Sequence, residues 1–208
     1  MKVVTIEGQL RSDFGKKAAR RDRSEGKVPC VIYGGSTNVH FTTTAKDLKT
    51  IVYTPEFKKA HIKVEGKEYI CILKDLQFDK ITDALTHVDL LELVDDKKVI
   101  ATIPLKFVGT SPGVKDGGKL VIKIKSLKVK TYPKYLKEQI EVSIDNLELN
   151  GNIRVEDVKA ENFEILNSPR IPIASVTMTR QLKQEEAAAT PAAGAAAPAA
   201  VPAAAAKK

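Results

Sequence analysis

A basic segment that ends at a glycine and continues directly into an apolar stretch constrains the fold of this chain more than any other feature. The segment, RSDFGKKAARRDRSEGKVPCVIYGG, spans residues 11–35. Two central alanines favour a helix, and Gly26 followed by Pro29 ends it. Ser12 or Asp13 is the expected N-cap. The sequence therefore predicts a short helix that passes at once into a strand.

The predicted helix carries a cationic stripe. On a period of 3.6 residues, Lys16, Arg20 and Arg23 fall on one face. Like charges on one face repel and do not stabilise a helix by themselves, so a polyanion facing them, RNA in particular, is one interpretation. A solvated face without a partner is the alternative, because runs of charge usually face water.

The charge of the whole chain is positive but unevenly distributed. The net charge is +8 over 208 residues. Residues 11–27 hold seven Lys or Arg against three acids, residues 115–137 hold eight Lys against one acid, and residues 138–186 hold ten acids against five bases. A basic chain favours acidic partners such as nucleic acid or a membrane surface. Neither a signal peptide nor an apolar run of membrane length is present, so a cytosolic protein without a membrane partner is expected.

Short apolar runs predict an α+β fold that is mainly β. Up to residue 95, strand patterns with short helices between them indicate a small mixed β-barrel. The charged sequence DDKK at residues 95–98 is the expected boundary, which gives an N-terminal domain of residues 1–95 and a β-rich domain of residues 96–182. Residues 183–208 are rich in Ala and Pro, with too few large apolar groups to offset the entropy of ordering, and are expected to be disordered.

Four local patterns give further expectations. Thr44 with Asp47 resembles a capping box that opens a helix. Gly66 predicts a tight hairpin turn, and residues 120–132 are expected to form one strand. Asn-Gly at residues 150–151 predicts a hairpin or a tight turn.

The two cysteines indicate a reducing compartment. Cys30 and Cys71 lie in apolar, strand-like runs, PCVIY and YICIL. Each is expected to be a small buried hydrophobe, without a disulfide between them.

The sequence His87-Val88-Asp89 places two polar side chains on the same face of a strand. Such a pair could hydrogen-bond base edges or riboses across the shallow minor groove of RNA. The alternative is a pair of surface side chains that binds no ligand. A catalytic pair would need a nucleophile, and no G-x-S-x-G elbow is present; metal-ligand spacings are also missing, so neither metal nor cofactor is expected.

Three further polar features have an ordinary structural interpretation, and for two of them a functional one is also open. Tyr33 could stack on a nucleotide, or simply cover the barrel core with its hydroxyl in water. Gln77 is by default an ordinary surface amide. Lysines alternate with aliphatic residues over residues 123–130, which is typical of a half-buried strand with a solvated face, or of a second phosphate contact.

Three ordered motifs resemble a known family. The run GKKAARRDRSEGKVPCVIYGG resembles the N-terminal signature of bacterial large-subunit ribosomal protein twenty-five, in its long CTC or general stress form. THVDLLEL at residues 86–93 resembles that family's His-x-Asp strand, and PLKFVGTSPGVKDGGKL at residues 104–120 resembles the start of the extra domain of long members. The resemblance covers about residues 1–182. Cys30 stands where a smaller residue is expected.

The resemblance implies a structural ribosomal protein without enzymatic activity or a small-molecule substrate. It implies binding of 5S ribosomal RNA at an irregular internal loop, a barrel similar to the anticodon-binding barrel of glutaminyl-tRNA synthetase, and neighbouring large-subunit proteins as partners in the cytoplasm. The alternatives are a stress-induced RNA-binding protein acting off the ribosome and a small hydrolase that uses the His-Asp pair. By motif position, the implied RNA contacts are Arg11, Lys16, Arg20, Arg21, Arg23, Tyr33, Gln77, His87 and Asp89.

Overall fold

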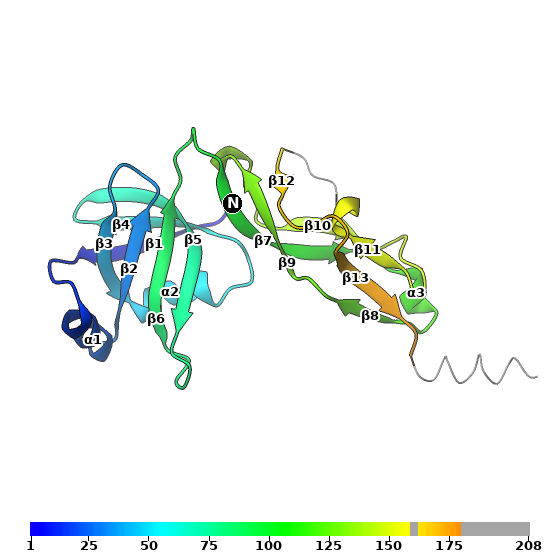
Figure 1. The fold of residues 1–208 in the computed structure, drawn as a ribbon, viewed down its shortest axis with the longest axis horizontal. Coiled ribbons are helices and arrows are strands. Elements are labelled where there is room, and N and C mark those ends of the chain that lie inside the picture. The colour runs from blue at the N-terminus through cyan, green and yellow to red at the C-terminus, as the bar shows by residue number, and fades with distance from the viewer. Residues whose placement is uncertain (159–161, 180–208) are drawn as a thin grey trace, which may run out of the picture.

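The computed structural model describes residues 1–158 and 162–179, which form two β-rich regions side by side (Figure 1). The fold is α+β and mainly β, as the sequence predicts. The expected disordered tail of residues 183–208 lies outside the described residues. Among the helices of the described part, none is long and apolar enough to cross a membrane.

The N-terminal region is a closed six-stranded barrel, which confirms the predicted architecture. The strands close in the order β1-β3-β2-β6-β5-β4; β1 with β4 and β2 with β6 pair in parallel, and the remaining neighbours are antiparallel. Closure leaves no strand edge unpaired. The strands are β1 Val3–Leu10, β2 Lys27–Tyr33, β3 Val39–Thr44, β4 Lys59–Val64, β5 Lys67–Phe78 and β6 Leu85–Glu92.

The barrel core is almost entirely aliphatic, as expected for a chain without tryptophan. Alternate residues of each strand point inward, and helix α2 (Ala45–Val52) adds two side chains. Phe41 is the one aromatic residue of this core, and both cysteines are part of it. The buried residues are Ile6, Val28, Cys30, Ile32, Phe41, Leu48, Ile51, Ala60, Ile62, Val64, Cys71, Val88 and Leu90.

The predicted turn at Gly66 is confirmed, and of the predicted capping box at Thr44 and Asp47 the Thr44 cap is confirmed, whereas the Asp47 carboxylate accepts a hydrogen bond from the Thr44 hydroxyl. Thr44 Oγ1 accepts a hydrogen bond from the Asp47 amide at 3.4 Å and so caps α2. Glu65 and Gly66 have φ values of 47° and 80°, the left-handed conformation that a two-residue hairpin turn requires. Gly26 follows the basic helix with φ of 77°.

The predicted N-cap of the basic helix is wrong. Helix α1 (Lys16–Ser24) begins after Gly15, whose φ is 105°, and no side chain caps it. Neither Ser12 nor Asp13 is at the cap position, because the left-handed turn at Gly15 delays the start of the helix. The Asp13 carboxylate lies instead 3.3 Å from the Arg21 guanidinium.

The C-terminal region contains two small sheets, in the orders β10-β7-β9-β12 and β11-β13-β8. Its core includes two residues from the barrel half, Phe57 and Ile72, so the two regions share buried surface. The elements are β7 Val99–Val108, α3 Pro112–Lys115, β8 Lys119–Ile122, β9 Ser126–Thr131, η1 Pro133–Tyr135, β10 Ile140–Ser143, β11 Asn152–Arg154, η2 Val155–Asp157, β12 Glu164–Ile165 and β13 Pro172–Thr177.

The single strand expected over residues 120–132 is two strands. β8 pairs with β13, whereas β9 pairs with β7 and β12 in the other sheet. Between them, the amides of Lys123 and Ile124 both donate to the carbonyl of Ile173, at 2.8 and 3.2 Å. This shared acceptor breaks the ladder and lets the chain cross from one sheet to the other.

The Asn-Gly signal marks a tight turn but no hairpin. Asn150 has φ of 60°, and the Gly151 amide donates to the Glu148 carbonyl at 3.0 Å. The strand that follows, β11, pairs with β13 rather than with the segment before the turn. The turn prediction is therefore confirmed, and the hairpin alternative is not.

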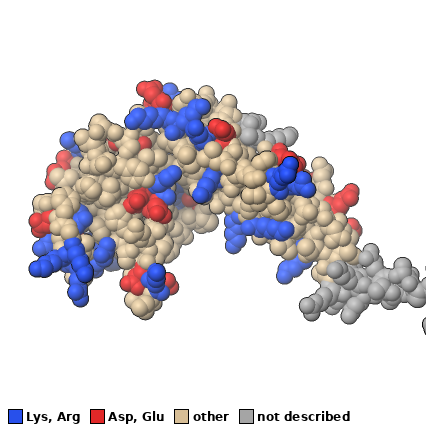
Figure 2. Space-filling model, viewed as in Figure 1, with Lys and Arg blue, Asp and Glu red and all other residues tan. Residues whose placement is uncertain are grey.

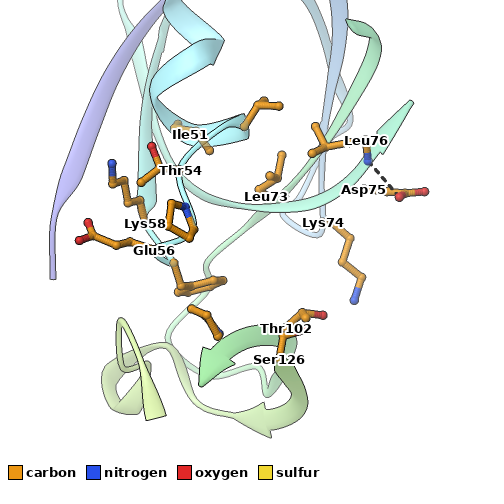
Figure 3. A pocket seen from close by; sticks show the side chains of 14 residues that line it. Ile51, Thr54, Glu56, Lys58, Leu73, Lys74, Asp75, Leu76, Thr102 and Ser126 are labelled. Atoms are coloured by element: carbon orange, nitrogen blue, oxygen red, sulfur yellow. Dashed lines mark hydrogen bonds between the residues drawn. The ribbon is translucent and has the colours of Figure 1, made fainter. Parts of the chain in front are cut away.

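A cavity of about 330 Å³ lies at the junction of the two regions (Figure 3). Leu73 and Leu76 of β5 belong to its lining on the barrel side, and Thr102 of β7 and Ser126 of β9 line it on the C-terminal side. None of the nine predicted contact residues lines this cavity. The predicted contacts therefore lie elsewhere on the surface of the barrel region.

Candidate nucleic-acid interface

The His-Asp pair lies on the outer face of β6. Val88 and Leu90, which alternate with His87 and Asp89, are completely buried in the barrel. The alternation of side chains along a strand therefore directs the pair outward. This is the arrangement that the sequence pattern predicts.

Strand register brings two other predicted residues to the same outer face. Gln77 of β5 is directly opposite His87, and Val31 of β2 is directly opposite Asp89. Tyr33 follows two residues after Val31 and so shares its face. Four predicted contacts, separated by up to 56 positions, thus lie on three adjacent strands.

The two members of the pair are in direct contact. His87 Nδ1 lies 2.7 Å from Asp89 Oδ1, and the side chains are 24% and 32% exposed. The nitrogen is nevertheless without an aligned hydrogen bond. Since this nitrogen is buried against the carboxylate, a partner could be reached only by the other ring nitrogen of His87 and the second carboxylate oxygen of Asp89.

Tyr33 lies close to acidic groups on this face. Partial burial, followed by the charges of Asp89 and Asp75, raises the pKa of the Tyr33 phenol above its ordinary value. The hydroxyl is therefore protonated at neutral pH and can donate a hydrogen bond. Asp75 lies opposite Asp89 on β5 and was not predicted for this face. Because it precedes Gln77 by two positions on the same strand, the alternation of side chains could have placed it there.

Helix α1 presents its cations away from the barrel. Ala18, Ala19 and Asp22 are half-buried on the inner side of the helix. Figure 2 shows Lys and Arg side chains gathered over α1, at the lower left of the view. The exposed cations are Lys16, Lys17, Arg20, Arg21 and Arg23.

A single hydrogen bond joins this helix to the strand that carries the pair. Arg23 Nε donates to the carbonyl of Thr86 at 3.1 Å, and Thr86 immediately precedes His87. The C-terminal end of α1 is therefore fixed beside the start of the His-Asp pair. The cationic helix and the polar strand face therefore adjoin at this hydrogen bond.

Arg11 differs from the other predicted cations because its side chain is largely buried. Its guanidinium lies 3.3 Å from the Asp22 carboxylate, and the two side chains are only 13% and 14% exposed. Arg11 thus connects the end of β1 to the inner face of α1. In contrast, Lys16 and Arg20 have no ion-pair partner within residues 1–158 and 162–179.

The cysteines lie inside the barrel, away from this surface. Both are free and buried, as the sequence predicts. Burial raises the pKa of each thiol to about 12, so neither forms a thiolate at neutral pH. Within the described part of the chain, no three His, Cys, Asp or Glu residues are grouped as metal ligands would be.

Two family models together match most of the chain. The model described as Ribosomal L25p family matches residues 6–90, a range that contains all nine predicted contacts. The model described as Ribosomal protein TL5, C-terminal domain, matches residues 98–180.

Curated relatives agree over nearly their whole length, and each has the name large ribosomal subunit protein bL25. The relative from Cytophaga hutchinsonii is 46% identical over 189 residues, 91% of this chain and 98% of its own. That from Amoebophilus asiaticus is 42% identical, over 88% of this chain and 93% of its own. The relative from Bacteroides fragilis is 35% identical, over 91% of this chain and 99% of its own.

A closed barrel with a basic helix beside an outward-facing polar strand, together with these matches, defines a structural ribosomal protein of the large subunit rather than an enzyme. More narrowly, the chain belongs to the bL25 family, in the long form with a TL5-type C-terminal domain.

Proposed function

We propose that this protein binds 5S ribosomal RNA through the outer face of its barrel and stabilises the central protuberance region of cytoplasmic large subunits. The observation that carries the proposal is the hydrogen bond from Arg23 to Thr86, which joins the cationic helix to the start of the His-Asp strand. RNA binding needs both parts, since phosphate contacts supply affinity and directed hydrogen bonds supply recognition.

The cations of α1 contact phosphates in this proposal. Lys16 and Arg20 are exposed and unpaired among the described residues, so they are available at little cost. Arg21 would exchange its exposed partner, Asp13, for a phosphate, and Arg23 would bind RNA through guanidinium nitrogens other than Nε. Arg11 remains in the proposed set as its least exposed member, because Asp22 holds its guanidinium against the inner face of the helix.

The strand residues recognise the shape of the RNA. Gln77 and His87 are side by side on adjacent strands and can reach base edges or riboses in a shallow, widened minor groove. Tyr33 donates through its protonated hydroxyl. Asp89 is an anion next to a polyanion, which is tolerable only if its carboxylate accepts a hydrogen bond from a base or a ribose.

We further propose that residues 1–95 are the RNA-binding domain and that residues 96–182 contact neighbouring large-subunit proteins. The C-terminal region contains a cavity of about 790 Å³ with Glu141, Glu148 and Asp157 in its lining. Acidic groups there suit basic protein surfaces better than RNA.

The test is a filter-binding titration of the full chain with 5S ribosomal RNA beside a generic RNA duplex of equal length. We expect 5S RNA to bind more tightly, and the preference to persist as the salt concentration is raised. Equal affinity for the two RNAs would refute recognition of 5S RNA. Cosedimentation of the endogenous protein with large subunits at physiological salt tests ribosome association separately.

A further inference from the structure

The loop between β1 and α1 presents an aromatic side chain that the proposed interface does not use. Phe14 is 63% exposed, although phenylalanine is ordinarily a core residue. It lies immediately before Gly15 and the first helical lysine, at the opposite end of α1 from Arg23. The nine residues of the helix separate these two ends by about 14 Å.

Two neighbouring side chains hold the Phe14 ring in place. The Arg11 guanidinium lies over it, 5.8 Å from the ring centroid. The His40 ring packs against it edge to face, with 5.3 Å between centroids and 77° between planes. Arg11 is itself fixed by Asp22. The ring is therefore oriented before any partner arrives, and most of the residue remains open to solvent.

The charges around Phe14 favour a polyanion. Lys16 and Lys17 follow it in sequence and are exposed. The two acids nearest in sequence on either side of the helix start, Asp13 and Asp22, are each in contact with an arginine. Repulsion of a phosphate chain is thereby reduced.

We propose that Phe14 is a stacking platform for one unpaired nucleobase of the bound RNA. A base within a duplex has both faces covered by its neighbours, so a base that is bulged or unpaired is the form that can stack on a protein ring. The inference rests on the proposed RNA binding and extends it: the RNA must offer an unpaired nucleotide about one α1 length from its contact with the His-Asp pair. Stacking accepts any of the four bases, because each has an aromatic face.

The experiment compares full-length Phe14→Leu with Phe14→Trp and wild type in binding to 5S ribosomal RNA. Leucine keeps apolar bulk but removes the ring, and we expect binding to weaken roughly 5- to 150-fold, the range for loss of one stacked base. Tryptophan should retain the affinity. Tyr53→Leu is the matched control, since Tyr53 is 61% exposed on the same barrel and should not change binding. Unchanged thermal unfolding of Phe14→Leu shows that the fold is retained.

Two readouts separate stacking from loss of charge or structure. The slope of log Kd against log salt should be unchanged in Phe14→Leu, because no phosphate contact is lost. In 5S RNA with 2-aminopurine at single unpaired positions, one position should change its fluorescence with wild type and not with Phe14→Leu. Wild-type affinity of Phe14→Leu for 5S RNA, or no 2-aminopurine position that depends on Phe14, would overturn the stacking inference and leave 5S binding intact. Failure of wild type to prefer 5S RNA would overturn both.

Discussion

The barrel and the C-terminal region both carry many lysines and arginines, but they display them differently. On the barrel, the cations project from a helix whose inner side packs on strands, next to a row of polar side chains. In the C-terminal region, Lys128 and Lys130 alternate on β9 with Leu127 and Val129, which are completely buried. An alternating strand needs a polar outer side whether or not a partner exists.

Local charge density alone does not distinguish the two regions. Residues 115–137 hold more cations than residues 11–27 and fewer acids. What distinguishes the barrel is the combination of unpaired helix cations with directional polar groups on fixed strands.

The largest expected effect comes from separating the two regions. Residues 96–208 alone should lose specific 5S binding, about a thousandfold or more in Kd, whereas residues 1–95 should bind nearly as well as the full chain. The fragment of residues 1–95 should be less stable than the full chain, because Phe57 and Ile72 become exposed to solvent when the C-terminal region is removed. Each exposed side chain should lower the free energy of unfolding by about 1.5 to 3 kcal/mol. Filter binding and urea unfolding measure these two results. Specific binding by residues 96–208 would reverse the comparison.

A smaller loss is expected when Asp89 is replaced by Ala. If the carboxylate accepts a hydrogen bond from RNA, its removal should cost about 1 to 3 kcal/mol of binding to 5S RNA and much less on a generic duplex. Asp75→Ala is the matched control, since Asp75 faces Asp89 across the strand pair. Removing its charge should leave affinity unchanged or slightly higher. Equal or tighter 5S binding by Asp89→Ala would remove this residue from the interface.

Replacing Arg20 by Ala should weaken binding to all RNAs by similar factors. The magnitude of the slope of log Kd against log salt should fall by about one unit, because one phosphate contact is lost. Lys128→Ala, an exposed cation on β9, serves as the control and should leave the slope unchanged. Matching decreases in the two variants would show that both regions bind phosphates.

The smallest effect concerns stability at alkaline pH and belongs to the barrel alone. Burial raises the pKa of the Cys30 and Cys71 thiols to about 12, whereas an unfolded cysteine ionises near pH 8.5. Between these values the unfolded chain has lost protons that the folded chain keeps, so the free energy of unfolding falls as pH rises. Below about pH 8.5 this contribution is constant.

Urea unfolding of wild type and of a Cys30→Ala, Cys71→Ala double variant at pH 7, 8.5 and 10 measures this effect. The decline should be shallower in the double variant. Parallel declines would mean that other groups are responsible.

Much of the barrel was predictable because its signals are local. The cap at Thr44, the left-handed turn at Glu65-Gly66 and the alternation around Val88 each depend on residues within a few positions of one another. Local propensity and period two are enough for such features.

The features that the sequence did not reveal depend on distant partners. Residues 120–132 alternate like one strand, and only the carbonyl of Ile173 on β13 breaks the ladder. Arg11 resembles the other cations until the fold places it beside Asp22. The exposed ring of Phe14 needs His40, from β3, to hold it. Ile173 and His40 lie far along the chain from their partners, and the pairing of Arg11 with Asp22, although both stand in one segment, depends on how α1 packs against the end of β1.

The parallel pairings that close the barrel also govern when the interface can exist. β1 pairs in parallel with β4, and β2 pairs in parallel with β6. In both pairings the partner residues follow more than fifty positions later in the chain. Closing loops of this length costs entropy before any contact repays it, so the closing pairs form late and together. During synthesis, the basic helix emerges first, without the strand that carries the His-Asp pair. In the proposed mode of binding, a nascent chain would offer RNA only unspecific charge, and selective binding would begin once residues up to Glu92 have emerged and the barrel has closed.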